Sequence, residues 1–361
     1  MKIINGNILL RNSILKGACL NIEKGKIKSL NKKPLRRRDG AIDAKECFIS
    51  PGFIDTHIHG DPEKVINYQM RYGTTAIVSA ISCSSPKGIK KSLDLIRKYQ
   101  HSGTMGSSVL GARIEGPFIS KGRAGAQDKR FIVSPSEATL RKIIGEARGI
   151  LKIMTIAPEL EGAERLIKIL GERGIIASMG HTDAGYKEAI RGIRCGITHA
   201  THLPNGMRRE PTPENAVHAC LVDGRVKVEM IFDLVHVPIG LLCKALKIKS
   251  KNNMILITDS VRAEMRGRKA VGGVYRLRDG TMAGSDLTMI DAIKNAVRFC
   301  GVDIRDAVAF ATINPARLLG VDARKGAISR GKDADLVIFD KNFDVKVTIV
   351  RGRIVYQKRG F

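Results

Sequence analysis

The middle of the chain alternates short apolar segments with segments of helical periodicity, and this alternation limits the possible folds more than any other feature. The apolar segments have the length and composition of buried strands, and the helical segments lie between them, for example over 86–99, 135–146, 161–173 and 184–192. Eight such units predict a (β/α)8 barrel of the TIM type, which is an α/β fold. The predicted strands are 52–56, 75–80, 108–114, 151–157, 174–179, 196–201, 228–232 and 253–258.

Both ends of the chain lack helical periodicity and are typical of short strands broken by turns. Strands are expected over 2–10, 19–22, 26–30, 334–339, 345–350 and 354–356. Two β-rich ends around a different middle predict one small β-sandwich domain that both termini build together. The expected division is 1–50 and 325–361 for this small domain, and 51–324 for the barrel.

Composition and cysteine usage indicate where the protein works. Apolar residues make up 43% of the chain, no apolar run is long enough to span a membrane, and the amino terminus lacks the apolar region of a signal peptide. The seven cysteines include no Cys-x-x-Cys pair, so we expect reduced thiols in a soluble cytoplasmic protein. They are Cys19, Cys47, Cys83, Cys195, Cys220, Cys243 and Cys300.

The charge is strongly positive, with 62 Lys and Arg against 35 Asp and Glu, for a net charge of +27. Such a charge attracts polyanions or an anionic substrate. A nucleic-acid binder usually concentrates its charge and interleaves aromatic residues, whereas here aromatics make up 4% and the densest basic cluster, 32–38, falls in a predicted turn. We therefore expect a solvated basic surface, with steering of a phosphorylated small molecule as the functional alternative and nucleic acid disfavoured.

Polar residues stand at the ends of most of the predicted barrel strands. Because the carboxyl ends of barrel strands meet at one face, these side chains are expected to converge. Histidines two apart on a strand also point to the same side. The polar residues at the strand ends are His57 and His59 on the first strand, Glu115 on the third, His181 after the fifth, His202 after the sixth and Asp259 after the eighth. This nitrogen and oxygen ligand set predicts a metal-dependent hydrolase, while His199, His218 and His101 are expected to be structural.

Several motifs also match a known family. They include Pro51-Gly-Phe-Ile-Asp-Thr-His-Ile-His-Gly60, Glu115-Gly-Pro-Phe118, Gly180-His-Thr-Asp183, Thr201-His-Leu-Pro-Asn-Gly-Met207, Thr258-Asp259 and Gly331-Lys-Asp-Ala-Asp-Leu-Val337. In these motifs, and in their order along the chain, the sequence resembles the N-acetylglucosamine-6-phosphate deacetylases of the amidohydrolase superfamily. The resemblance implies hydrolysis of the acetamide of N-acetylglucosamine 6-phosphate, a linear amide, to glucosamine 6-phosphate and acetate.

The resemblance also implies roles for the rim residues. Glu115, His181 and His202 would hold the principal divalent metal, and His57 with His59 would supply a second site. Zinc is expected, with iron, manganese or cobalt as alternatives, and one or two ions remain open. Metal-activated water would attack the amide carbonyl, while Asp259 would take the proton and return it to the leaving amine.

Substrate contacts follow from the resemblance in the same way. Asn205, Gly206 and Arg209 would bind the phosphate, and His236 stands at the family's substrate histidine. The other implied substrate-binding residues are Ala126, Gln127, Met282, Ala283 and Gly284. The family is usually a homodimer that completes this site with the neighbouring subunit.

Departures from the family pattern fall in substrate-facing loops, for example at Asp61-Pro62-Glu63, Pro204 and Leu234, so they weaken the identity of the sugar more than the reaction. Another amidohydrolase is therefore an alternative, acting on N-acetylgalactosamine 6-phosphate, an N-acyl-D-amino acid or a dihydroorotate-like cyclic amide. A lysine bridge between two metals is disfavoured, because Lys152 lies at the start of the fourth strand. The second alternative, a non-catalytic barrel that binds polyanions, conflicts with the intact ligand set.

Overall fold

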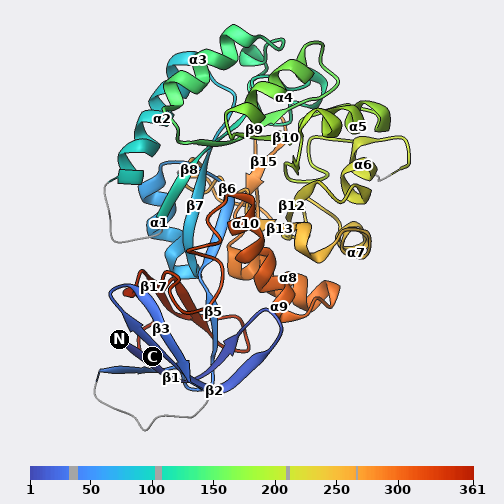
Figure 1. Cartoon of the computed structure of the whole chain (residues 1–361). Helices are drawn as coiled ribbons and strands as arrows, with labels where there is room; N and C mark the ends of the chain where they lie inside the picture. Colours follow the sequence, from blue (N-terminus) through green and yellow to red (C-terminus); the bar gives the residue numbers. More distant parts are fainter. Residues whose placement is uncertain (32–39, 102–107, 209–211, 266) are drawn as a thin grey trace.

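The computed structural model describes residues 1–31, 40–101, 108–208, 212–265 and 267–361. The basic cluster 32–38 and Arg209 lie outside the described residues. A larger α/β part stands above a smaller β-rich part, to which both termini belong (Figure 1). Within the described ranges, no helix has the length and apolar character needed to cross a bilayer.

Eight parallel strands form the barrel, and each pairs with the next along the chain. Their side chains are almost all buried, as expected where helices cover one side of a sheet and the barrel interior fills the other. They are β6 (Phe53–His59), β7 (Thr74–Ile81), β8 (Ser108–Glu115), β9 (Leu151–Ile156), β10 (Ile176–Met179), β11 (His199–Ala200), β12 (Lys227–Ile231) and β13 (Met254–Ile257). The eight predicted strands and the barrel are confirmed.

The first and last barrel strands come together through polar contacts. The Asp259 amide donates to the His57 carbonyl at 2.9 Å, and the His59 amide donates to the Ser260 carbonyl at 2.9 Å. The Thr258 hydroxyl donates to the buried carboxylate of Asp55 at 2.6 Å. These bonds close the barrel and fix the carboxyl ends of β6 and β13 against each other.

Helices cover the outside of the barrel (Figure 1). Each helix presents an apolar face to the strands, which is the pattern that the periodicity predicted. They are α1 (Pro62–Gln69), α2 (Pro86–His101), α3 (Glu137–Ala147), α4 (Ala163–Glu172), α5 (Tyr186–Cys195), α6 (Ala216–Val222), α7 (Ile239–Ile248), α8 (Met289–Cys300), α9 (Ile304–Phe310) and α10 (Ile313–Leu318).

The small domain is one mixed sheet to which both ends of the chain contribute. Its order is β18-β17-β16-β5-β1-β2-β3, with β4 on β1, and β16 pairs antiparallel with β5. The bounds are β1 (Lys2–Leu9), β2 (Ile14–Glu23), β3 (Lys26–Asn31), β4 (Ala41–Asp43), β5 (Phe48–Pro51), β16 (Leu336–Phe339), β17 (Val345–Val350) and β18 (Arg353–Gln357). Its apolar cluster joins Ile3 and Ile49 to Leu336 and Ile349. The predicted domain made from both termini is therefore confirmed.

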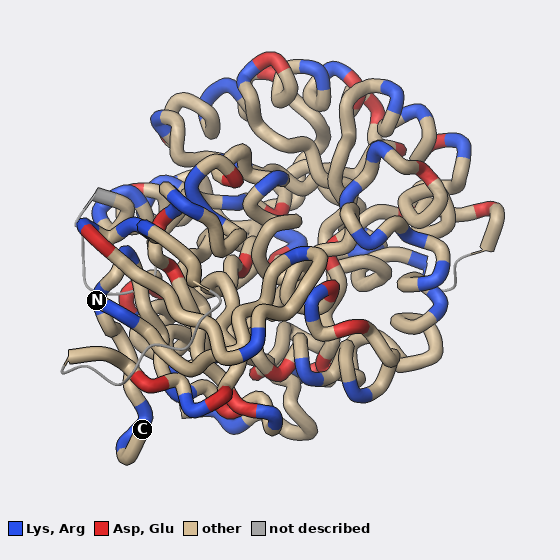
Figure 2. Tube along the Cα trace, turned by 60° about the horizontal axis from the view of Figure 1, so that its bottom comes forward, with Lys and Arg blue, Asp and Glu red and all other residues tan. Residues whose placement is uncertain are grey.

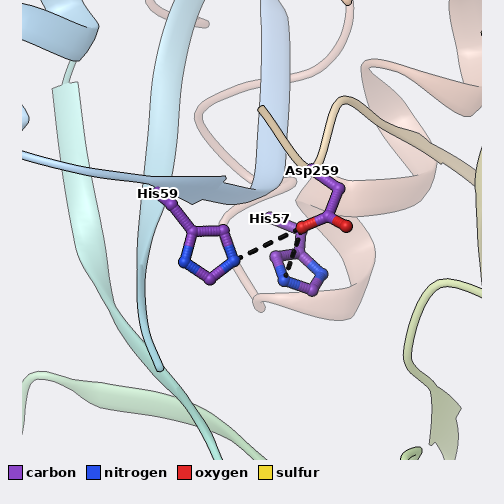
Figure 3. A group of neighbouring side chains, drawn as sticks. All are labelled: His57, His59 and Asp259. Carbon is purple, nitrogen blue, oxygen red and sulfur yellow. Dashed lines mark ion pairs between the residues drawn. The ribbon is translucent and has the colours of Figure 1, made fainter. Parts of the chain in front are cut away.

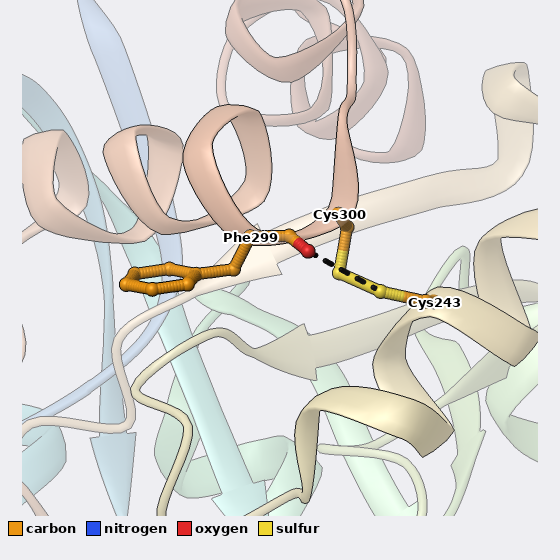
Figure 4. Close-up of a disulfide and its surroundings, with 3 residues drawn as sticks. All are labelled: Cys243, Phe299 and Cys300. Carbon is orange, nitrogen blue, oxygen red and sulfur yellow. Dashed lines mark hydrogen bonds between the residues drawn. A yellow bond between two sulfur atoms is a disulfide. The ribbon is translucent and has the colours of Figure 1, made fainter.

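Two cysteines behave differently from the prediction. Cys243 of α7 and Cys300 of α8 form a disulfide with Cα atoms 5.3 Å apart. Figure 4 shows this bond beside Phe299, whose carbonyl lies 3.8 Å from the Cys243 sulfur. The expectation of seven reduced thiols is wrong for this pair, because packing brings together residues that no sequence spacing connects. The other five cysteines form no disulfide.

Candidate metal centre

The six predicted ligands and acid–base residues meet at the carboxyl face of the barrel, and all are buried. Three of them, His181, His202 and Asp259, lie two residues beyond the ends of their strands and adopt left-handed backbone conformations, with φ of 48°, 32° and 49°. Non-glycine residues rarely adopt this conformation, and it turns each side chain sharply inward at the end of its strand. The backbone is therefore shaped to bring these groups together.

One cluster combines His57, His59 and Asp259, whose ligand atoms all lie within 4.8 Å of one another. Figure 3 shows both imidazoles directed toward the carboxylate. Oδ1 of Asp259 lies 3.3 Å from Nε2 of His57 and 3.3 Å from Nε2 of His59. The two histidines of β6 thus share one face, as their spacing predicted.

A second cluster combines Glu115, His181 and His202. Oε1 of Glu115 lies 3.2 Å from Nε2 of His202 and 3.8 Å from Nε2 of His181. The same Oε1 lies 3.1 Å from Nε2 of His57, so the two clusters adjoin at Glu115. Together they offer four imidazoles and two carboxylates.

The donor set fits a divalent cation. Nδ1–H of His181 donates a hydrogen bond to the Arg123 carbonyl at 2.9 Å, and this tautomer leaves a lone pair on Nε2. Nε2 of His57, Nε2 of His181 and Oε1 of Glu115 are buried and make no hydrogen bond among the described residues. Buried lone pairs directed at a common point are the arrangement that zinc and similar metals require.

The electrostatics keep both carboxylates ionised. Burial by itself would raise the pKa of Glu115, but the facing imidazoles of His57, His181 and His202 outweigh it and hold the pKa well below its usual range. Burial opposes ionisation of Asp259 in the same way, and His57 and His59 lower its pKa. Negative charge therefore resides where a cation would bind.

Glu229 of β12 and Arg113 of β8 form a buried ion pair next to His57, and neither residue was predicted to belong to the site. Both are fully buried, and Nη1 of Arg113 donates to Oε1 of Glu229 at 2.6 Å. Oε2 of Glu229 lies 3.3 Å from Nδ1 of His57, and Thr56 donates to Oε1 at 2.8 Å. A charged residue inside an otherwise apolar strand is the sequence signal that could have identified both.

Gln127, predicted to contact substrate, is bonded to the metal site. Its amide nitrogen donates to Oε2 of Glu115 at 2.8 Å, and its amide oxygen accepts from the Cys83 backbone at 2.7 Å. The side chain therefore fixes the orientation of Glu115. Ser82 lies 3.3 Å from Nδ1 of His59 and orients that imidazole similarly.

A cleft of about 250 Å³ opens above the two clusters. Its walls include β15 (Met282–Ser285) together with Leu277 and Thr281 of the turn that joins β15 to β14 (Val274–Arg276). All predicted substrate-binding residues within the described ranges line it. They are Ala126, Gln127, Asn205, Gly206, His236, Met282, Ala283 and Gly284.

Asn205, Gly284 and His236 differ in what they contribute to the lining of the cleft. Nδ2 of Asn205 is buried without a partner among the described residues, so it is a free donor. Gly284 lets β15 pass the rim closely, because a Cβ there would lie 2.8 Å from the Asp259 carbonyl. His236 bonds Asp233 through Nδ1 at 2.5 Å, which directs its other nitrogen away from Asp233.

Comparisons with known proteins agree with this geometry. The family model described as "Amidohydrolase family" matches residues 48–355. N-acetylglucosamine-6-phosphate deacetylase of Bacillus subtilis is 33% identical, over 97% of this chain and 95% of the relative. N-acetylgalactosamine-6-phosphate deacetylase of Escherichia coli O157:H7 is 29% identical, over 89% and 94%.

Solved structures give the same result for the whole fold. N-acetylglucosamine-6-phosphate deacetylase of Thermotoga maritima superposes with a TM-score of 0.87 at 30% identity, covering 99% of this chain and 100% of that one. A mutant of the Mycobacterium smegmatis enzyme, in complex with N-acetyl-D-glucosamine-6-phosphate, superposes with a TM-score of 0.91 at 27% identity, covering 99% of each chain.

Proposed function

Because this chain belongs to the amidohydrolase family and, within it, to the N-acetylglucosamine-6-phosphate deacetylases, we propose that it hydrolyses N-acetylglucosamine 6-phosphate to glucosamine 6-phosphate and acetate. One observation carries the reaction type. Two buried clusters of histidine and carboxylate ligands, with lone pairs turned toward each other, form the floor of an open cleft. This arrangement suits metal-assisted hydrolysis of an amide.

Glu115, His181 and His202 would hold the principal ion, and His57 with His59 would hold a second. When bound, the metal supplies a Lewis acid for the amide carbonyl and makes a water acidic enough to lose its proton near neutral pH. Zinc is the proposed metal because all ligands are imidazole or carboxylate, and iron, manganese or cobalt would accept the same set.

Asp259 would move the proton. Its carboxylate is ionised, lies between His57 and His59, and borders the cleft, so it can accept a proton from an attacking water. Transfer of that proton to the nitrogen of the leaving amine returns the carboxylate to its first state. One residue therefore serves as base and then as acid.

The sugar phosphate would lie in the cleft against residues from several loops. The free Nδ2 of Asn205 supports a donor role toward phosphate oxygen, and Gly206 places its backbone beside it. Arg209, outside the described residues, would add a bidentate contact to the phosphate. His236 would contact the sugar, with Ala126, Gln127, Met282, Ala283 and Gly284 completing the wall.

We also propose that the protein is a homodimer that works in the cytoplasm. The family resemblance supports the homodimer. Five of the seven cysteines form no disulfide, which suits a reducing compartment, and the Cys243–Cys300 bond is the exception. Light scattering of the purified protein measures the oligomeric state directly.

An acetate-release assay tests the substrate. Zinc-loaded protein should release acetate from N-acetylglucosamine 6-phosphate far faster than from unphosphorylated N-acetylglucosamine. N-acetylgalactosamine 6-phosphate is a third arm, because the Escherichia coli relative carries that name. Equal rates with and without phosphate would refute the phosphate contacts, and release from neither phosphorylated sugar would refute the proposed function.

A further inference from the structure

The positive charge of +27 far exceeds what one phosphate group in the active site needs. Basic residues are distributed around the whole molecule (Figure 2), and many arginines are neutralised by a neighbouring carboxylate. Examples are the pairs Arg130–Asp128, Arg225–Asp223 and Arg305–Asp303. A place where several cations lack such partners is therefore distinctive.

A cleft of about 820 Å³ lies at the end of the barrel opposite the metal centre. It opens between the first residues of β8 and β9 and the hairpin turns of the small domain. The described lining residues include six cations and no carboxylate. The cations are Lys24, Lys152, Arg324, Lys325, Arg351 and Arg353.

Five of these six cations form no ion pair in the described part of the chain. Lys325 is the exception, because it is buried and pairs with Asp333 and Asp335. The Lys152 ammonium donates to the Gly149 carbonyl at 3.4 Å and meets no carboxylate among the described residues. Like charges gathered along one concave surface reinforce one another's field, and Lys24, Arg324, Arg351 and Arg353 are exposed to an incoming ligand.

The backbone that carries these cations is held rigidly. Lys24-Gly25 and Arg351-Gly352 form the two-residue turns of the β2–β3 and β17–β18 hairpins, and all four residues have positive φ. Ala334 joins the turns, because its amide donates to the Gly25 carbonyl at 2.9 Å and its carbonyl accepts from Gly352 at 3.0 Å.

The residues chosen for these turns are not those that fit them most easily. Lys24 has φ of 49° and Arg351 has φ of 46°, in turns where Asn or Gly would relieve the strain. Residues other than Gly, Asn and Asp rarely adopt this conformation. The two strained turns thus place Lys24 and Arg351 among the residues that line the cleft.

The cleft is separate from the metal centre. β8 begins in the cleft at Ser108 and ends at the ligand Glu115, so the two sites lie about 23 Å apart along this strand. A ligand in the cleft would therefore not compete for the deacetylase site.

We propose that this cleft binds a small anion that carries several linked phosphate groups, such as a nucleotide or an inorganic polyphosphate. Its volume lies within the range of small-molecule sites, roughly 300–1,000 Å³. Five unpaired cations from four segments can contact several linked phosphates at once, whereas a single phosphate group can contact only some of them.

Titration calorimetry of the full-length, zinc-loaded protein in 0.15 M KCl tests this site, with tripolyphosphate, ATP and inorganic phosphate as probes. Tripolyphosphate or ATP should bind at least tenfold more tightly than inorganic phosphate. If ATP binds more tightly than tripolyphosphate, the ligand is a nucleotide. If the two bind equally, the site recognises the phosphate chain. Binding of neither probe, or equal binding of inorganic phosphate, would overturn the proposal.

Two double variants separate the cleft from the overall charge. Arg351→Gln/Arg353→Gln should weaken tripolyphosphate binding at least tenfold. Arg173→Gln/Arg194→Gln removes two exposed arginines that lie outside the cleft, and should change tripolyphosphate binding less than twofold. Thermal unfolding and the rate of acetate release verify that both variants are folded. Equal weakening in the two variants would mean diffuse attraction only, and would refute the site.

Discussion

His57 presents Nε2 to the metal centre because Nδ1 faces the buried carboxylate of Glu229 at 3.3 Å. A carboxylate behind a ligating imidazole fixes both its tautomer and its orientation. Burial by itself would raise the pKa of Glu229, but the Arg113 guanidinium holds it below its usual range, so the carboxylate stays ionised. The ligand geometry thus depends on residues that never touch the cleft.

Glu229→Gln should therefore lower zinc affinity by roughly 10–100-fold. It should also destabilise the fold by about 3–5 kcal/mol, because Arg113 is left buried without its partner. Competition with a zinc-chelating dye measures the affinity, and denaturant unfolding measures the stability.

The double variant Arg113→Met/Glu229→Gln separates these two effects. It should regain much of the stability, because no unpaired charge remains in the barrel, while zinc affinity stays low. Recovery of zinc affinity along with stability would show that Glu229 acts on the fold alone.

Asp259→Asn should lower the rate of acetate release by roughly 10³-fold or more, because an amide cannot accept the proton. Metal content, measured by mass spectrometry, should be retained, since Glu115, His181 and His202 remain intact. Loss of the metal together with activity would assign Asp259 as a ligand of the His57 and His59 cluster.

His199 makes stability depend on pH. Its imidazole is buried and Nδ1 contacts Ser178 at 2.8 Å. Burial lowers its pKa to about 4 from 6.5. The unfolded chain therefore binds a proton first as pH falls, and stability is lost between pH 6.5 and 4. Urea unfolding at several pH values should show a smaller loss of stability for His199→Asn, which keeps an amide near Ser178. An unchanged loss of stability would assign the pH dependence to other groups.

Five of the eight barrel strands, β6, β8, β10, β11 and β13, contribute both to the core and to the predicted metal centre. Apolar side chains bury the strand, and the residues that follow turn inward in strained conformations at His181, His202 and Asp259. Packing over the whole strand holds that strain in place, because no single residue could sustain it. The site is therefore as rigid as the sheet beneath it.

At the level of helices, the Cys243–Cys300 disulfide joins α7 to α8 across a sequence separation of 57 residues. Closing a loop of this length stabilises a fold by about 4 kcal/mol in the chain-entropy model. Cys300→Ser should lower the free energy of unfolding by a large part of that amount, whereas Cys195→Ser, at a free cysteine, should change it little. Thiol labelling of the denatured parent should find five reactive cysteines; seven would refute the bond.

For the whole molecule, the net charge of +27 should draw anionic substrates toward the protein. The kcat/KM for N-acetylglucosamine 6-phosphate should fall as KCl rises from low concentration to about 0.3 M, because salt screens the attraction. The neutral sugar serves as the control, and its kcat/KM should change little. An identical salt response for both sugars would exclude steering.

The sequence by itself determined the barrel, the order of its strands and the identity of the rim residues. These follow from local periodicity, and the carboxyl ends of parallel strands meet wherever the rest of the chain lies. The small domain built from both termini could be predicted for the same reason. His57 and His59 could be placed on one face because a strand repeats every two residues.

Only the tertiary structure decided which distant groups touch. Arg113 and Glu229 are separated by 116 residues, and Cys243 and Cys300 by 57, so no local pattern connects either pair. The partner of Gln127 and the cations of the 820 Å³ cleft likewise depend on how separate elements pack. Contacts of this kind arise from the packing of the whole chain, which periodicity along the sequence does not encode.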